Sequence, residues 1–356
     1  MRQANEDLSA ALDRQAARHG FRSRFVKVGP FTIRLRTDSN ADQLALETAF
    51  DPSPVRAQDK PDLTVYVACA SDRSACVLRS VLEPLVSTAP SGLKGLADRA
   101  AAPCVVMHDR PHQLLKLFDA KSANAVLFIG DPDLLPGWER FSPLKEFIHL
   151  LALSHDCLLL HAGSVVDKES HRSVLLVGPG GAGKSSLTAF AVHQGMRTHG
   201  DDYVLVDLRA AQPRCWAIYR TLKLHPSSPA AGLTRGLERW QVDALSQKTV
   251  YLGAGDGSDA SAASGDSFAA QTDIAGICGL TQRASTSGMD DRARVDPNKN
   301  PYVYCYMSTI QQIPYWVGST LQLTKQLHQA VGYWALSVDD GVGGMTDALR
   351  RIRALL

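Results

Sequence analysis

The chain has 356 residues, 45% of them hydrophobic and 21% charged, with a formal net charge of +2. This length is enough for two domains, and the composition is that of a globular chain. The near-neutral balance gives no reason to expect binding to nucleic acid or to a membrane surface. No apolar run approaches the ~20 residues that span a bilayer, and the charged N-terminus lacks the apolar segment of a secretory signal.

The seven cysteines are scattered along the chain and form no C-x-x-C pair; they lie at positions 69, 76, 104, 157, 215, 278 and 305. Neither a zinc site nor a disulfide framework is therefore expected. A reducing cytoplasm is the predicted compartment.

The first part of the chain predicts a β-rich domain. Residues 1–20 have the pattern of one amphipathic helix. Period-two alternation or continuous apolar character then predicts strands at 31–37, 63–69, 104–109, 112–119 and 125–130. The close spacing of the strands after residue 100 predicts an antiparallel meander.

A helix is predicted over residues 142–156. Ser142 is placed to act as its N-cap, with Pro143 at the first helical position. We expect an N-terminal β-rich α+β domain over 1–141, this connecting helix, and a second domain over 157–356.

The second domain begins with two apolar strands, at 157–167 and 173–178, followed by a helix that ends before Gly195. Further expected elements are a strand pair at 202–208 and 215–220, a helix at 308–332, a strand at 333–339 and a helix at 345–356. The polar segments 253–273 and 284–300 predict loops, either as variable insertions or as a lid beside an active site.

Residues 178–185 match the phosphate-binding pattern G-x-x-x-x-G-K-[ST] at every fixed position, between an apolar strand and a helix. Glycines allow positive φ and bring backbone N–H groups close to phosphate oxygens. Lys184 can reach the β- and γ-phosphates, and the Ser185 hydroxyl can ligate Mg²⁺. The chain has no N-K-x-D guanine signature, so ATP is the expected nucleotide. The nucleotide-binding residues are Gly178, Pro179, Gly180, Gly181, Ala182, Gly183, Lys184, Ser185 and Ser186.

Two carboxylates, Asp201 and Asp202, precede the apolar strand at 202–208. Such a pair suits a kinase, in which one carboxylate organises the metal and the other accepts a proton from the attacking hydroxyl. Because close carboxylates raise one another's pKa, the pair would favour a base near neutrality. An acidic helix-to-strand turn without catalytic role is the alternative. Asp207, at the end of the strand, could instead serve as a Walker B carboxylate.

His161 ends an apolar run just before the phosphate-loop strand, where a histidine can serve in the core or in the site. The order "LHAGSVV", "LLVGPGGAGKSSL" and "HGDDYVLV" resembles that of the HPr kinase/phosphorylases and, more distantly, the phosphoenolpyruvate carboxykinases. The resemblance implies a phosphoenolpyruvate-carboxykinase-type P-loop domain with a mixed α/β sheet and much antiparallel pairing, preceded by a smaller β-rich domain.

The resemblance also implies roles for single residues. Lys184 and Ser185 would hold phosphates and metal, with Asp201 near the metal, which would be Mg²⁺ or else Mn²⁺. Asp202 would be the base, and His161 would lie near the γ-phosphate. Lys223 and Arg283 are candidates for neutralising phosphate charge, although a lysine on a core strand can also simply extend its charge to solvent.

The HPr kinases carry an E-I-R-G-L-G segment after the acidic pair; "CWAIYRTLKLHP" stands there in this chain, which argues against a phosphorylase reaction. The architecture is similar to that of lasso-peptide-biosynthesis kinases. The predicted function is therefore transfer of the ATP γ-phosphoryl group to a serine of a peptide or small protein, such as a lasso-peptide precursor. The alternatives are a P-loop ATPase or switch and a nucleotide-sensing module without a phosphoryl acceptor. The sequence leaves open whether the chain forms a homo-oligomer.

Overall fold

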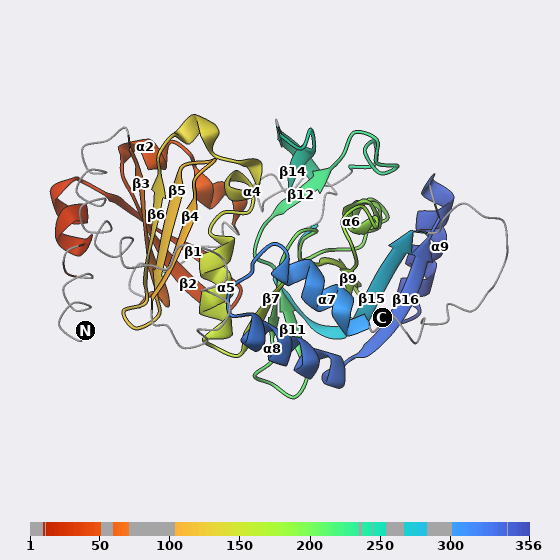
Figure 1. Cartoon of the computed structure of the whole chain (residues 1–356). Coiled ribbons are helices and arrows are strands. Elements are labelled where there is room, and N and C mark those ends of the chain that lie inside the picture. The colour runs from red at the N-terminus through yellow and green to blue at the C-terminus, as the bar shows by residue number, and fades with distance from the viewer. Residues whose placement is uncertain are drawn as a thin grey trace. The chain divides into compact units, whose positions relative to one another are not determined.

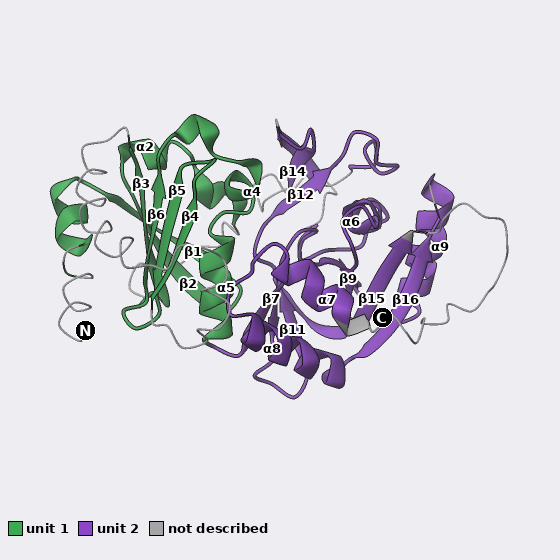
Figure 2. Cartoon of the chain, viewed as in Figure 1, with its two compact units in different colours: residues 1–154 green, residues 155–356 purple. Residues whose placement is uncertain are grey.

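The computed structural model describes residue 10 and residues 12–50, 60–70, 104–234, 237–243, 245–253, 267–282, 301–339 and 341–356. The chain divides into two compact units, Met1–Ser154 and His155–Leu356 (Figure 2). Each unit contains its own mixed sheet.

The sheet of unit 1 has six strands in the order β1-β2-β3-β6-β5-β4 (Figure 1). These are β1 (Arg22–Val28), β2 (Phe31–Thr37), β3 (Leu63–Cys69), β4 (Cys104–Asp109), β5 (Leu114–Asp119) and β6 (Asn124–Ile129). The predicted meander is confirmed, because β4, β5 and β6 pair antiparallel in sequence order. β3 joins β2 and β6 in parallel, and β1, which had no separate prediction, pairs antiparallel with β2.

Short helical segments complete unit 1: α2 (Ser39–Asp42), η1 (Leu46–Ala49), η3 (Pro132–Leu134), α4 (Gly137–Arg140) and α5 (Lys145–Leu153). The described part of the predicted N-terminal helix, residues 12–18, is helical. Its Leu12 and Ala16 form a core cluster with Tyr66 of β3 and Leu117 of β5. The amphipathic pattern therefore marks a face that packs on apolar side chains of the sheet strands.

The predicted start of the helix over 142–156 is wrong. α5 begins at Lys145, and Leu144 before it has a left-handed φ of 62° with no side-chain cap. The N–H of Leu144 donates instead to Oε1 of buried Glu139, at 2.9 Å. A carboxylate from α4 thus takes the part that the sequence pattern assigned to Ser142.

Glu139 also belongs to a buried ion cluster. The Lys116 ammonium on β5 donates to Oε2 of Glu139 and, at 2.6 Å, to Oε2 of Glu146 on α5. Burial works to lower the pKa of Lys116, but the two carboxylates outweigh it and raise that pKa. The cluster ties the sheet of unit 1 to both helices through charge.

The main sheet of unit 2 has seven strands in the order β7-β10-β11-β15-β9-β8, with β16 also paired to β15. They are β7 (Cys157–Leu160), β8 (Gly163–Val166), β9 (Arg172–Val177), β10 (Val204–Asp207), β11 (Arg214–Trp216), β15 (Gln271–Gln282) and β16 (Gly332–Val338). β9, β15 and β16 run parallel, and the other pairs are antiparallel. A mixed sheet with substantial antiparallel pairing was predicted and is found.

A second, three-stranded sheet was not predicted. It has the order β12-β14-β13 and consists of β12 (Thr221–Leu224), β13 (Leu237–Val242) and β14 (Thr249–Gly253). The predicted loop over 253–273 is wrong at its ends, since Gly253 closes β14 and Gln271 opens β15. Residues 254–266 and the predicted loop over 284–300 lie outside the described residues.

The helices of unit 2 are α6 (Lys184–His193), α7 (Pro301–Ile310), α8 (Val317–Ala330) and α9 (Gly341–Arg353). The predicted C-terminus of α6 is confirmed, with Gly195 after the cap at φ 86°. The single helix predicted over 308–332 is two helices, because Pro314 removes a backbone donor between α7 and α8. Val174 and Leu176 of β9 share a core cluster with residues of α6 and α9.

Among the described residues, no helix is long and apolar enough to cross a membrane. The six cysteines in this part of the chain are free, and five of them are at least nine-tenths buried.

Removing the ammonium from the unit 1 cluster tests its contribution to stability. Lys116→Met leaves two carboxylates in a buried position without their counter-charge, and we expect a loss of about 3–5 kcal/mol in unfolding free energy. Urea unfolding followed by circular dichroism at pH 7 measures it. Lys121→Met, at an exposed lysine of the next turn, is the control and should change little.

A second variant provides a test of the same cluster if Lys116→Met does not fold. Combining it with Glu139→Gln and Glu146→Gln removes all three charges, and stability should recover in part. A single Lys116→Met variant as stable as wild type would contradict the importance of the cluster.

Candidate active site

The phosphate loop connects β9 to α6 and depends on glycine at three places. Gly178, Gly181 and Gly183 have φ values of 151°, 80° and 92°. A Cβ at Gly178 would lie 2.7 Å from the Leu280 carbonyl oxygen, so this glycine is also required by the close approach of β15. Nothing lies within 4 Å of a Cβ built on Gly181 or Gly183. The loop therefore has both the backbone freedom and the open space that anion binding by N–H groups requires.

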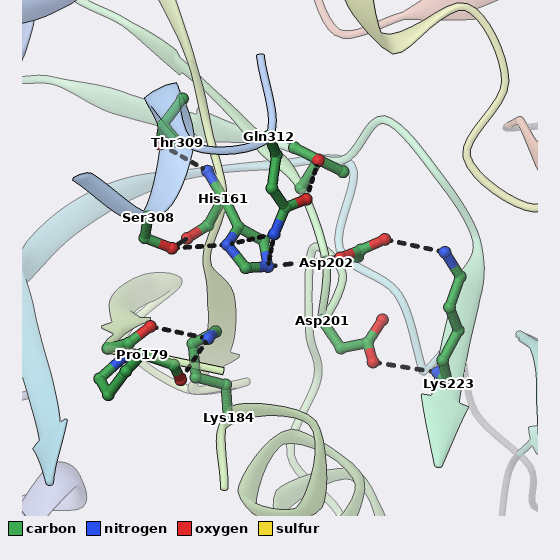
Figure 3. A network of polar contacts seen from close by, with 11 residues as sticks. His161, Pro179, Lys184, Asp201, Asp202, Lys223, Ser308, Thr309 and Gln312 are labelled. Atoms are coloured by element: carbon green, nitrogen blue, oxygen red, sulfur yellow. Dashed lines mark hydrogen bonds and ion pairs between the residues drawn. The ribbon is translucent and has the colours of Figure 1, made fainter. Parts of the chain in front are cut away.

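Lys184, the first residue of α6, is largely buried and folds back onto its own loop. Its Nζ donates to the carbonyl oxygens of Gly178, at 2.9 Å, and Pro179, at 3.2 Å (Figure 3). Burial lowers the pKa of Lys184, while the charges of Asp202 and Asp201 oppose that shift. The Lys184 ammonium is thus held at the loop by two backbone carbonyl oxygens, which phosphate oxygens can replace as its hydrogen-bond partners.

Asp201 is the buried member of the acidic pair, 2% exposed. Its Oδ2 accepts the backbone N–H of Lys223 on β12 at 2.9 Å, and its Oδ1 has no hydrogen-bond partner among the described residues. Burial, followed by the charge of Asp202, raises the pKa of Asp201 to about 6; the nearby Ser185 hydroxyl works in the opposite direction.

Asp202 lies between two nitrogen donors (Figure 3). Its Oδ2 is 2.8 Å from Lys223 Nζ, and its Oδ1 is 3.4 Å from His161 Nε2. Burial works to raise the pKa of Asp202, but the charge of Lys223 and the contact with His161 hold that pKa well below its usual range. The Asp202 side chain keeps 23% exposure, so this carboxylate is ionised and accessible.

The expected pKa pattern is therefore corrected. The sequence placed a base with raised pKa at this pair, with Asp202 in that role, whereas the structure raises the pKa of Asp201 and lowers that of Asp202. Burial is the main cause of the raised pKa of Asp201, and the charge of Asp202 adds to it. The Lys223 ammonium pairs with Asp202 and lowers the pKa of that carboxyl, while the backbone N–H of Lys223 donates to Asp201.

The other predicted residues have different outcomes. His161 lies between β7 and β8 with its ring beside Asp202, and Lys223 faces the carboxylate of Asp202. Arg283 lies outside the described residues. Sequence reasoning missed Ser308 and Gln312, whose side chains contact the His161 ring. The sequence pattern predicts only a helix over 308–332, without a role in the site.

Asp207, the alternative Walker B residue, ends β10 and already has a charged partner. Both carboxylate oxygens of Asp207 accept hydrogen bonds from Arg209, at 2.9 and 2.7 Å. This arrangement argues against a metal-binding role for Asp207.

A divalent cation fits beside the phosphate loop. The buried Asp201 Oδ1 is an unpartnered oxygen near the Ser185 hydroxyl, and oxygen donors of this kind suit Mg²⁺. In the described part of the chain, no group of three or more His, Cys, Asp or Glu residues could hold a metal ion. The single carboxylate of Asp201 near the Ser185 hydroxyl suits Mg²⁺, which uses one or two carboxylates together with substrate phosphates.

The turn that carries the acidic pair is held by buried His199. Its backbone N–H donates to Ser164 Oγ at 2.7 Å. Its Nδ1 lies 2.6 Å from the Ala269 carbonyl oxygen and its Nε2 lies 2.8 Å from Thr272 Oγ1. A carbonyl only accepts, so Nδ1 carries the proton and Nε2 accepts from the threonine. A neutral histidine thus joins β8 and the start of β15 to the turn.

Comparisons with known proteins add little. No protein-family model matches the chain, and no curated protein sequence matches it. Among solved structures the chain is similar to "Structure of the Hpr(Ser) kinase/phosphatase from Coxiella burnetii", with 15% identity and a TM-score of 0.22. That match covers 40% of this chain and 72% of the other. It is a weak structural similarity to a kinase, and at this score it carries no argument about the site.

The buried His199 predicts acid sensitivity. Burial lowers its pKa from 6.5 to about 4, so the folded state binds this proton less readily than the unfolded state. The stability from neutral His199 is complete above pH 6.5 and is lost as pH falls toward 4. From pH 7 to pH 5 the loss is about 2 kcal/mol. Asp201, with its raised pKa, contributes a change of opposite sign, so the measurement must be a difference between variants.

The comparison is wild type against His199→Gln, with exposed His155→Gln as the control. His199→Gln should destabilise the chain at pH 7, and the gap in urea-unfolding free energy should shrink by about 2 kcal/mol at pH 5. A gap that stays constant between these pH values would show that His199 is not held neutral.

Proposed function

We propose that the chain is an ATP-dependent phosphotransferase that transfers the γ-phosphoryl group to a serine hydroxyl of a peptide or small protein. The observation that carries this proposal is the position of an ionised, accessible carboxylate, Asp202, beside the phosphate loop. Transfer to a serine releases the hydroxyl proton as the oxygen bonds to phosphorus, so the reaction needs an acceptor for that proton close to the phosphates. Asp202 provides such an acceptor.

The phosphate loop would hold ATP through its backbone N–H groups and Lys184. A phosphate would replace the carbonyls of Gly178 and Pro179 as partners of the ammonium. Ser185 and Asp201 would hold Mg²⁺ or Mn²⁺. The ion, when bound, supplies charge neutralisation for the phosphates.

In the reaction, the serine oxygen bonds to the γ-phosphorus as the bond from that phosphorus to the ADP oxygen breaks. Asp202 takes the hydroxyl proton. A strong base is not required, because in a loose transition state the proton leaves late and little charge develops on the attacking oxygen. The low pKa of Asp202 keeps it ionised at neutral pH, so it is ready to hydrogen-bond the hydroxyl.

Lys223 contributes in two places. Its ammonium keeps Asp202 ionised, and its backbone N–H fixes one oxygen of Asp201. We propose that Lys223 acts through these carboxylates and that its charge, paired with Asp202, would help to neutralise the transferred group. Arg283, predicted for the same purpose, stays a proposal from the sequence.

The acceptor class rests on the resemblance of the motifs to peptide and protein serine kinases, and a lasso-peptide precursor is one candidate. The rival, an ATPase or switch with Asp207 as its carboxylate, is weakened by the pairing of both Asp207 oxygens with Arg209. A nucleotide-sensing module would bind ATP without transferring phosphate.

The experiment is transfer from γ-labelled ATP to a panel of serine-containing peptides, including lasso-precursor sequences. Asp202→Asn should lower the transfer rate by about 100-fold or more, since the variant loses the proton acceptor. ATP affinity, measured by calorimetry, should change far less. Asp207→Asn is the matched control and should keep transfer.

Each alternative gives a different result. The switch would be favoured if Asp207→Asn lost ATP turnover while Asp202→Asn kept it. Binding without hydrolysis or transfer by the wild-type chain would favour the sensing module. Either result would overturn the kinase proposal.

A further inference from the structure

His161 has little support from its own strands. It lies between the end of β7 at Leu160 and the start of β8 at Gly163, outside the strand ladders. Two of its hydrogen-bond partners come from α7, a helix about 150 residues later in the chain. The backbone N–H of His161 donates to Thr309 Oγ1 at 3.1 Å, and its ring Nδ1 lies 2.5 Å from Ser308 Oγ. α7 therefore holds both the backbone and the ring of this residue (Figure 3).

The hydroxyl of Ser308 has an unusual partner for a helical serine. Serine and threonine in helices commonly bond the carbonyl four residues earlier in their own helix. Thr309 does so, donating to the Cys305 carbonyl at 3.0 Å. Ser308 is directed at His161 instead, with its Oγ close to Nδ1 and 3.5 Å from the His161 carbonyl oxygen.

Donor and acceptor requirements define the ring state. Asp202 accepts from the Lys223 ammonium through Oδ2, and its other oxygen, Oδ1, lies 3.4 Å from His161 Nε2, so the ring N–H is placed on Nε2. Nδ1 of a neutral ring then carries a lone pair, which accepts the Ser308 hydroxyl at 2.5 Å. The Ser308 hydroxyl thus favours the tautomer whose N–H points to Asp202, as second partners of functional histidines commonly do.

Gln312 covers the ring from its exposed side. Its Nε2 lies 3.0 and 3.1 Å from the two ring nitrogens. The Tyr203 hydroxyl donates to Gln312 Oε1, which turns the amide nitrogen toward the ring. Tyr203 follows Asp202 directly in the chain, so its hydrogen bond links the Gln312 side chain to the turn that carries Asp201 and Asp202.

We propose that Ser308 is a positioning residue of the phosphoryl-transfer site: it holds His161 Nδ1 and thereby keeps a proton on Nε2, facing Asp202 and the transferred group. This inference rests on the proposed function. Ser308 acts through His161 and does not itself touch the reacting atoms. The role requires the hydroxyl, so Ser308→Thr should perform it and Ser308→Ala should not.

The kinetic test uses the full chain with Ser308→Ala, Ser308→Thr and the control Thr346→Ala. Thr346 has a helix hydroxyl that donates to the Val342 carbonyl of α9. Ser308→Ala should lower kcat by about 10- to 100-fold, the range for partners that orient a functional histidine, with the KM for ATP changed less than about twofold. Ser308→Thr should restore most of kcat, and Thr346→Ala should behave as wild type. Equal kcat in Ser308→Ala and wild type would overturn the proposal, as would failure of Ser308→Thr to rescue a loss.

A second measurement does not depend on catalysis. ¹⁵N spectra of the histidine rings, with His161→Gln to assign the signal, report which nitrogen carries the proton. Wild type and Ser308→Thr should show the Nε2–H form, and Ser308→Ala should show a mixture of tautomers. An unchanged spectrum in Ser308→Ala would overturn the inference. If the wild-type chain transfers no phosphate to any acceptor, the kinase proposal fails, while this spectrum still decides whether Ser308 controls His161.

Discussion

Two neighbouring carboxylates in a buried turn are the constraint on which the site of unit 2 depends. Removing a carboxylate from water costs several kcal/mol, and two adjacent charges repel each other. The turn resolves this conflict in two ways. Asp202 is neutralised by Lys223, and Asp201 is left with a raised pKa. Lys223 of β12 and His161 of the β7–β8 connection both lie beside Asp202, so segments distant in the chain meet at the pair.

The buried charges of the two units illustrate the difference between a closed and an open cluster. In unit 1, both oxygens of Glu139 have partners, Lys116 and the Leu144 N–H, so the cluster is complete. In unit 2, Asp201 keeps one oxygen without a partner among the described residues. A complete cluster stabilises a fold, whereas an incomplete one beside a phosphate loop offers a place for a cation. The contrast supports function in unit 2 on physical grounds.

Local sequence patterns predicted those parts of the site and the fold whose residues lie close together in the chain. The phosphate loop requires its glycines, Lys184 and Ser185 at fixed spacing, and Asp201 and Asp202 are neighbours in the chain. Strands β2, β3 and β4 were predicted with their observed bounds because alternation and apolar runs directly reflect burial. The cap at Ser142 failed because a carboxylate from another helix, Glu139, replaced it.

The sequence by itself determined the candidate phosphate loop and the two carboxylates of the acidic pair, and it predicted that the sheet of unit 2 is mixed. Only the tertiary structure decided how the pair divides its charge, because that depends on which side chain approaches each carboxylate from β12. It also paired Asp207 with Arg209, and brought Ser308 of α7 to His161. The division of charge and the contact of Ser308 with His161 depend on long-range packing, which leaves no periodic or spaced signal in the chain.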